Sequence, residues 1–210
     1  MGSIPVIYED DWLLIAEKPP GLLVVPAPGT GGRTLTAIVN DELKDRTASY
    51  HLHPCHRLDR ETSGLVMFAK GKAAQEKFMQ LFSDRSIKKT YQAFVHGRLA
   101  HARGRITSPI ENKPALTDYR VVAQKDDFAV VEVMPQTGRT NQIRIHFKAI
   151  GHPLVGESRF AFRKDFRLRA KRLMLHAHAL EFTHPFTGKP MRVESGPARD
   201  MQRFLEGHQA

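Results

Sequence analysis

The run HRLDRETSG places Arg57, Asp59 and Arg60 directly before Thr62 and Ser63. It follows neither the helical nor the strand period, so we expect a loop that bears a site. An ionised carboxylate such as that of Asp59 can act as a nucleophile or as a general base. A single Asp in a polar loop is more often a turn former or a helix cap, so the rest of the chain has to decide between the two.

Histidines form a second group of candidate ligands. His51, His53 and His56 lie close together in sequence, and His176 and His178 alternate along an expected strand. Such spacing is compatible with zinc, but no H-E-x-x-H helix motif accompanies it. We therefore predict no metal.

Two further patterns carry little weight. Cys55 beside His56 imitates a nucleophile and its base, but neighbours in sequence rarely face each other, and no second motif supports acyl transfer. The stretch PGTGGRT lacks the Gly-Lys-Ser/Thr ending that cradles a triphosphate, so we expect a flexible loop there.

The chain is strongly basic. It holds 32 Lys plus Arg against 22 Asp plus Glu, a formal net charge of +10, and its pI is about 9.9. Such an excess attracts a polyanion, and nucleic acid is the first candidate. From charge alone, a solvated basic surface is an equally good explanation.

Cysteine content and hydropathy indicate the compartment. Cys55 is the only cysteine, so neither an internal disulfide nor a multi-cysteine zinc site can form, as is typical of a reducing cytoplasm. Charged residues interrupt every apolar run, and MGSIPVIYEDDW lacks a basic segment followed by an apolar core. We predict a soluble, cytoplasmic protein.

The first part of the chain surrounds the Asp59 loop with strands and helices. VIYEDDWLLIAEK has two apolar runs around a polar turn, which is typical of a β-hairpin. A Pro- and Gly-rich loop follows, and Thr34 is placed to cap a helix that runs to about Leu43. LVMFAK then predicts a buried strand, and KAAQEKFMQLFSDR predicts a helix. The apolar face of this helix holds Ala74, Phe78, Leu81 and Phe82.

Strands dominate the second part. The runs with strand character are TYQAFVHG, GRITSPI, LTDYRVVAQ and FAVVEVMP, followed later by LMLHAHALEF and MRVES. TNQIRIHFKAIG predicts a helix with Ile143, Phe147 and Ile150 at helical spacing and Gly151 at its end. A last amphipathic helix is expected near DMQRFLEG. Without internal repeats or a long linker, residues 1–210 predict a single α+β domain.

Five segments resemble, in order, motifs of the RluA-type pseudouridine synthases. They are KPPGLLVVP (18–26), HRLDRETSG (56–64), KKTYQAFVHG (88–97), QTGRTNQIRIHFKAIGHPLVGE (136–157) and RLMLHAHALEFTHPFTGKPM (172–191). One such run can recur by chance, but five in order at similar spacing cover nearly the whole chain. The departure is Asn141, where the family more often has His, and this changes the hydrogen bonding expected beside Arg144.

The resemblance implies an RNA isomerase without a cofactor. Uridine and pseudouridine are isomers: the bond from N1 to C1′ breaks, the uracil turns, and C5 bonds to C1′. This chemistry needs neither a nicotinamide, nor a nucleoside triphosphate, nor a metal. The implied fold is a mixed, largely antiparallel sheet flanked by helices, with the RNA crossing a basic cleft.

The resemblance makes Asp59 the catalytic carboxylate. It can add to the base, attack or stabilise an electron-poor C1′, or remove a sugar proton, and the sequence leaves all three open. Desolvation would favour its neutral form. By resemblance Arg144 is the expected salt-bridge partner, since Arg stays protonated and offers a planar fork. Tyr91 is expected to lie against the flipped uracil.

Other basic residues are expected to contact RNA. By resemblance Arg57 fills the gap that the flipped base leaves. Arg60, Lys88, Lys89 and Arg139 are candidate phosphate contacts.

Three functions stay open at this point: an RNA isomerase, a non-catalytic RNA-binding module, and a metal-dependent hydrolase. The set of Asp59, Tyr91 and Arg144 favours catalysis. Many relatives carry an N-terminal S4-type RNA-binding domain, whereas this sequence begins at the catalytic domain. We therefore expect the catalytic domain to find its own target, a compact stem-loop of rRNA or tRNA. A monomer without an obligatory protein partner is the simplest expectation.

Overall fold

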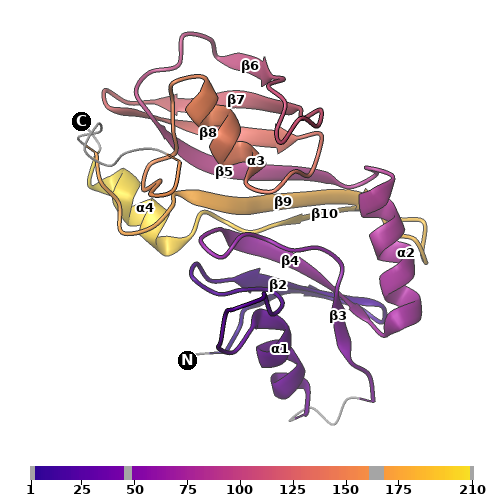
Figure 1. Ribbon diagram of the computed structural model, residues 1–210. Helices are drawn as coiled ribbons and strands as arrows, with labels where there is room; N and C mark the ends of the chain where they lie inside the picture. Colours follow the sequence, from indigo (N-terminus) through magenta and orange to yellow (C-terminus); the bar gives the residue numbers. More distant parts are fainter. Residues whose placement is uncertain (1–2, 45–48, 161–167, 209–210) are drawn as a thin grey trace. The chain divides into compact units, whose positions relative to one another are not determined.

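The computed structural model describes residues 3–44, 49–160 and 168–208 (Figure 1). It has the mixture of helices and antiparallel strands that the sequence predicts. The chain forms two compact units, one from Met1–Lys88 with Ala179–Ser195 and the other from Lys89–His178 with Gly196–Ala210. The single domain across residues 1–210 stays a prediction, and each unit is described in turn.

The first unit is a small antiparallel sheet with two helices. Its elements are β1 (Val6–Glu9), β2 (Leu13–Lys18), α1 (Leu35–Lys44), β3 (Leu52–Pro54), β4 (Ser63–Lys70), α2 (Lys72–Ser83), the end of β9 (Leu175–Thr183) and β10 (Pro190–Glu194). The pairs β1–β2, β2–β4, β3–β4 and β9–β10 are all antiparallel. Figure 1 shows α1 next to β3, and α2 next to β3 and β4. The predicted hairpin, strand and both helices are confirmed.

Short polar side chains set the boundaries of these elements. In the hairpin turn, the Asp10 carboxylate accepts hydrogen bonds from the backbone N–H groups of Trp12 and Leu13, at 2.8 and 2.9 Å. Before α1, the Thr34 hydroxyl accepts a bond from the N–H of Ala37 at 3.3 Å, which is the cap that the sequence predicts.

The second unit is an antiparallel sheet covered on both faces. Its elements are β5 (Lys88–His96), β6 (Arg103–Ile106), β7 (Thr117–Gln124), β8 (Phe128–Pro135), α3 (Gln142–Ala149), the start of β9 and α4 (Arg199–Glu206). The sheet has the order β5-β8-β7-β6, and each of these pairs is antiparallel. Figure 1 shows α3 lying against β7 and β8.

Strand alternation divides the side chains of β5 between the two faces. Ala93 and Val95 join the core that includes Ile143 and Phe147 of α3, and Tyr91 packs against the same cluster. Phe94 instead joins the core that includes Met201 of α4. The register of β5 therefore places Tyr91 on the side of the sheet that α3 covers.

The helix α3 forms as predicted. Ile143 and Phe147 are buried, whereas Ile150 is 36% exposed. Ile150 caps the helix after its last residue, Ala149, and its N–H still donates to the carbonyl of His146 at 3.2 Å. Gly151 then turns the chain with a φ of 81°, as expected for a residue that ends a helix.

Buried histidines make the second unit sensitive to acid. Burial, with help from Arg172 and His178, lowers the pKa of His176 to about 4, although Gly196 and Asp200 act in the opposite direction. The folded form thus keeps His176 neutral at a pH where the unfolded chain takes up a proton. A group of this kind costs stability as the pH falls below the unfolded pKa.

We predict that the free energy of unfolding falls by about 3 kcal/mol more in the natural protein than in His176→Gln between pH 6.5 and pH 4. Urea unfolding at each pH measures this difference. His96 and His146 also have lowered pKa values. The natural protein and His176→Gln both retain these two histidines, so the difference between their pH slopes reports on His176 alone. The exposed His101 gives a control in His101→Gln, and equal pH slopes for all three proteins would refute the assignment.

Candidate active site

The segment with Asp59 is a loop, as predicted. Residues 57–62 lie between β3 and β4 and belong to neither a helix nor a strand. The backbone carbonyl of Asp59 accepts a bond from the N–H of Thr62 at 3.1 Å, which forms a tight turn. Leu58 is buried and Asp59 is half-buried, so a neighbouring apolar residue fixes the turn that presents the carboxylate.

A buried ammonium group holds this loop in place. Lys18 is 0% exposed, and its Nζ donates to the backbone carbonyls of Pro19, Leu22 and Arg60 at 3.0, 2.7 and 3.1 Å. The first two carbonyls belong to the KPPGLL segment, and the third follows Asp59 directly. Charge-assisted bonds of this kind are stronger than neutral ones, so Lys18 ties the two segments together.

Arg60 and Gly21 reinforce the same connection. The N–H of Gly21 donates to the carbonyl of Arg60 at 2.7 Å, and Nε of Arg60 donates to the carbonyl of Gly21 at 3.1 Å. Gly21 has a φ of 84°, a conformation that favours glycine. Arg60, predicted as a phosphate contact, thus also has a structural bond.

His56 serves the fold of the loop. The backbone N–H of Met67 donates to Nε2 of His56 at 3.1 Å, so Nε2 carries no proton. The ring packs against Phe82 with the centroids 4.7 Å apart. Within the described residues, no group of three or more His, Cys, Asp or Glu side chains could hold a metal ion.

Arg144 lies in α3 and is 3% exposed. Its Nε and Nη2 donate to the two carboxylate oxygens of Glu157 at 2.7 and 2.8 Å, and Nη1 donates to Oδ1 of Asn141 at 2.9 Å. Burial raises the pKa of Glu157, but the Arg144 guanidinium and backbone N–H groups outweigh it and leave that pKa below its ordinary value. The pair is therefore ionised, and Asn141 supplies the acceptor beside Arg144.

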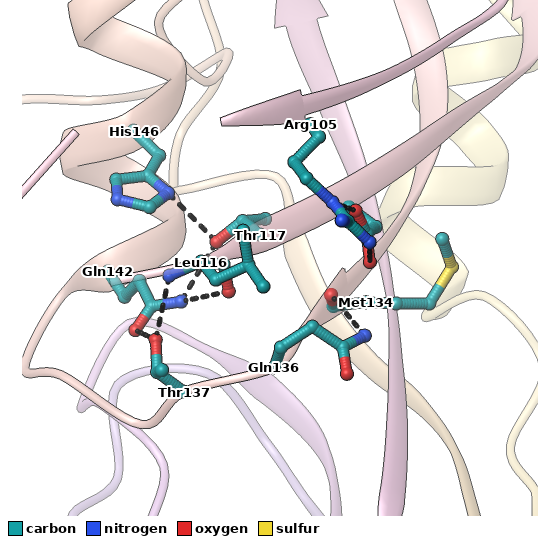
Figure 2. A network of polar contacts seen from close by, with 9 residues as sticks. Arg105, Leu116, Thr117, Met134, Gln136, Thr137, Gln142 and His146 are labelled. Carbon is teal, nitrogen blue, oxygen red and sulfur yellow. Dashed lines mark hydrogen bonds and ion pairs between the residues drawn. The ribbon is translucent and has the colours of Figure 1, made fainter. Parts of the chain in front are cut away.

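A chain of buried polar groups fixes α3 against β7 (Figure 2). The side-chain amide of Gln142 donates to Leu116 and Thr117 at 2.9 Å each, and its oxygen accepts from the Thr137 hydroxyl at 2.7 Å. His146 donates from Nε2 to the carbonyl of Ser108 at 2.9 Å. Its Nδ1 therefore accepts from the Thr117 hydroxyl, also at 2.9 Å.

This network sets the direction of Arg144. Gln142 and His146 lie two residues before and after it, so the helix that carries the guanidinium is fixed on both sides. Burial lowers the pKa of His146 despite its bond to Ser108, and the neutral ring fits the donor and acceptor roles that it has here. Sequence reasoning did not find the network, because its partners on β7 are distant in the chain.

The remaining predicted site residues divide between the units. Arg57 and Lys88 are exposed and lie in the first unit, whereas Lys89, Tyr91 and Arg139 are half-buried and lie in the second, as Arg144 does. Nε of Arg139 donates to the carbonyl of Pro114 at 3.2 Å. Lys18 and Glu157 were not predicted as site residues, although Lys18 begins the motif KPPGLLVVP and Glu157 ends the motif QTGRTNQIRIHFKAIGHPLVGE.

Comparison with known proteins decides the family. Residues 12–149 match the model of the RNA pseudouridylate synthase family. The chain belongs to this family. It is 37% identical to the dual-specificity RNA pseudouridine synthase RluA of Yersinia pestis, over 90% of this chain and 97% of that protein. It is also 35% identical to the uncharacterized RNA pseudouridine synthase YlyB of Bacillus subtilis strain 168, over 97% of this chain and 72% of that protein.

Solved structures share the fold of this pseudouridylate synthase. The human RNA pseudouridylate synthase domain containing 4 aligns with a TM-score of 0.80 at 22% identity, over 96% of this chain and 91% of the other. The predicted α+β fold with a mixed, largely antiparallel sheet is confirmed, as is the prediction of an RNA pseudouridine synthase as the class of enzyme. Every helix in the described part of the chain is too short or too polar to span a bilayer.

We predict that Lys18→Met lowers the free energy of unfolding by about 3 kcal/mol, because three backbone carbonyls lose their buried donor. Urea unfolding measures the loss, and faster hydrogen exchange at the Gly21 amide locates it in the loop. The matched control is Lys44→Met, because the Lys44 side chain is 72% exposed and its loss should change stability by less than about 0.5 kcal/mol. Equal stability of the two variants would contradict the anchoring role.

Proposed function

We propose that this pseudouridylate synthase converts a specific uridine of structured rRNA or tRNA into pseudouridine, with Asp59 as the catalytic carboxylate. RNA uridine isomerisation is the activity of the family to which the chain belongs. The target and the roles of individual residues are our proposal. The observation that carries it is the fully buried Lys18, whose ammonium is bonded to the carbonyl beside Asp59.

A fixed loop suits the carboxylate of an isomerase. The bond from N1 to C1′ breaks, the uracil turns, and C5 bonds to C1′, after which C5 loses a proton and N1 gains one. Every atom comes from the substrate and solvent protons. Asp59 would act on a nucleoside that has left the RNA stack. Its carboxylate therefore has to be held in the correct position before the nucleoside binds. The proposal covers addition to the base, action at C1′ and removal of a sugar proton.

Arg144 is the proposed partner of Asp59. A buried carboxylate needs a nearby cation to stay ionised, and an Arg remains protonated in such surroundings. The support from the structure is that the Arg144 guanidinium is buried and held in one orientation by Glu157 and Asn141. A cation whose direction is already set can stabilise charge without reorganising during the reaction.

Tyr91 is the proposed stacking surface for the flipped uracil. Tyr91 is a partly buried aromatic residue that packs against the core of its unit, and stacking of a base on such a ring contributes about 1–3 kcal/mol. Arg57 is proposed to fill the vacated place in the RNA. Arg60, Lys88, Lys89 and Arg139 are proposed to contact phosphates, in keeping with the net charge of +10.

The names of the relatives suggest which RNAs to test first. The Yersinia relative is described as a dual-specificity enzyme. A Salmonella typhi relative, 34% identical over 96% of this chain and 69% of that protein, is described as the ribosomal large subunit pseudouridine synthase C. Large-subunit rRNA is therefore the first substrate for an assay, and tRNA stem-loops, the other class that we propose, are the second. We propose that a monomer acts on them without a protein partner.

We predict that Asp59→Ala abolishes pseudouridine formation yet leaves the Kd for RNA within about 3-fold, because electrostatic affinity comes from Lys and Arg contacts. A pseudouridine map of total RNA, made with the natural protein and with the variant, tests the activity and identifies the target. An active variant would refute the role of Asp59. If the natural protein forms no product but binds RNA, the protein is a binding module, and loss of activity with a chelator would indicate a metal-dependent hydrolase.

A further inference from the structure

Glu157 is a buried carboxylate with an unusually full set of donors. Its side chain is 1% exposed. Oε1 accepts bonds from the backbone N–H groups of Ser158, Arg159 and Phe160 at 2.9, 2.7 and 3.2 Å. The Arg144 guanidinium donates to both oxygens. One carboxylate therefore joins the guanidinium to the turn of residues 158–160.

Stability alone is a poor explanation for this ion pair. Taking two charges out of water costs several kcal/mol for each ion, and apolar residues of similar volume often replace buried pairs without loss of stability. What a bidentate pair supplies is direction, because the planar fork fixes the orientation of the guanidinium. The geometry therefore favours a positioning role for Glu157.

Two further groups confine the same guanidinium. Oδ1 of Asn141 accepts from Nη1 at 2.9 Å, and the ring of Phe160 lies 5.0 Å from the Cζ atom of Arg144. The same ring lies 5.3 Å from the Cζ atom of Arg159, which is exposed. Phe160 thus connects the buried arginine with one at the surface.

The backbone conformation directly before Glu157 requires a glycine. Gly156 has a φ of +80°, and a Cβ atom there would lie 1.9 Å from the carbonyl oxygen of Arg172. The N–H of Glu157 donates to the carbonyl of Leu154 at 3.0 Å. The position of the carboxylate is thus fixed from its own backbone as well as from its partners.

We propose that Glu157 is a positioning residue for the isomerisation, which acts through Arg144 by setting the direction of the guanidinium. Phe160 assists by covering the guanidinium. This inference rests on the proposed function, in which Arg144 pairs with Asp59. It adds a carboxylate that does not touch the substrate and on which the rate nevertheless depends.

The variant Glu157→Gln keeps the size of the side chain and an acceptor for the backbone, but removes the charge. We expect the single-turnover rate to fall by about 100-fold, because a misplaced catalytic group costs that much, while the Kd for RNA stays within about 3-fold. The matched control is Glu132→Gln, which breaks the surface pair in which Arg120 donates from Nε and Nη2 at 3.2 and 2.6 Å. The control should keep the rate of the natural protein.

A double-mutant cycle with Arg144→Lys separates positioning from general structure. If Glu157 acts through the fork of Arg144, Glu157→Gln should slow the Arg144→Lys protein by less than about 5-fold, because the two effects are coupled. A full further loss of about 100-fold would overturn the inference, as would a natural rate in Glu157→Gln itself. Should Asp59→Ala remain active, the proposed function fails instead, so the two failures are distinguishable.

A second variant keeps the proposal testable if Glu157→Gln does not fold. Phe160→Leu retains the carboxylate and an apolar side chain but removes the aromatic face from the guanidinium. We expect about a 10-fold slower single turnover with an unchanged Kd. In that case, a natural rate in Phe160→Leu would by itself overturn the proposal.

Discussion

The loop that carries Asp59 depends on an ammonium group that has been taken out of water. A buried Lys without partners would lose its proton or open the structure. Lys18 instead meets three backbone carbonyls, which are also groups that need a donor once they are buried. Each side therefore satisfies the other. The Asp59 loop has little regular structure of its own, so this exchange is what gives the loop a single conformation.

The same principle organises the second unit around Arg144. Its charge is matched by Glu157. Elsewhere, between α3 and β7, the amide, hydroxyl and imidazole groups of Gln142, Thr117 and His146 have complementary donor and acceptor roles (Figure 2). If some of these buried polar groups lacked hydrogen-bond partners, the network would stabilise the fold less than an apolar core does. Full satisfaction makes the network rigid instead. Lys18 in the first unit and Arg144 in the second are thus each held in one position, as the proposed catalysis requires.

The sequence predicted most elements of the fold because their signals are local. Hairpin, helix and strand periods are read over a few residues, and the Thr34 cap and the Gly151 turn were found in this way. The partners of Lys18 and Arg144 were missed because they lie farther away in the chain. Arg60 lies 42 residues from Lys18 and Glu157 lies 13 residues from Arg144, and no local pattern reports such a pairing.

The family resemblance indicates the candidate site residues, whereas the structure shows the contacts that hold some of them in place. Motif order points to Asp59, Tyr91 and Arg144, since these residue types stand where the family's motifs place them. It does not say what keeps them in place, because the supporting contacts go to backbone carbonyls and to residues whose chemistry looks ordinary in isolation. An isomerase that exchanges no group with a cofactor has only position and charge with which to lower its barrier. In the mechanism that we propose, the buried residues that hold the charges therefore matter to the rate as much as the residues that contact the substrate.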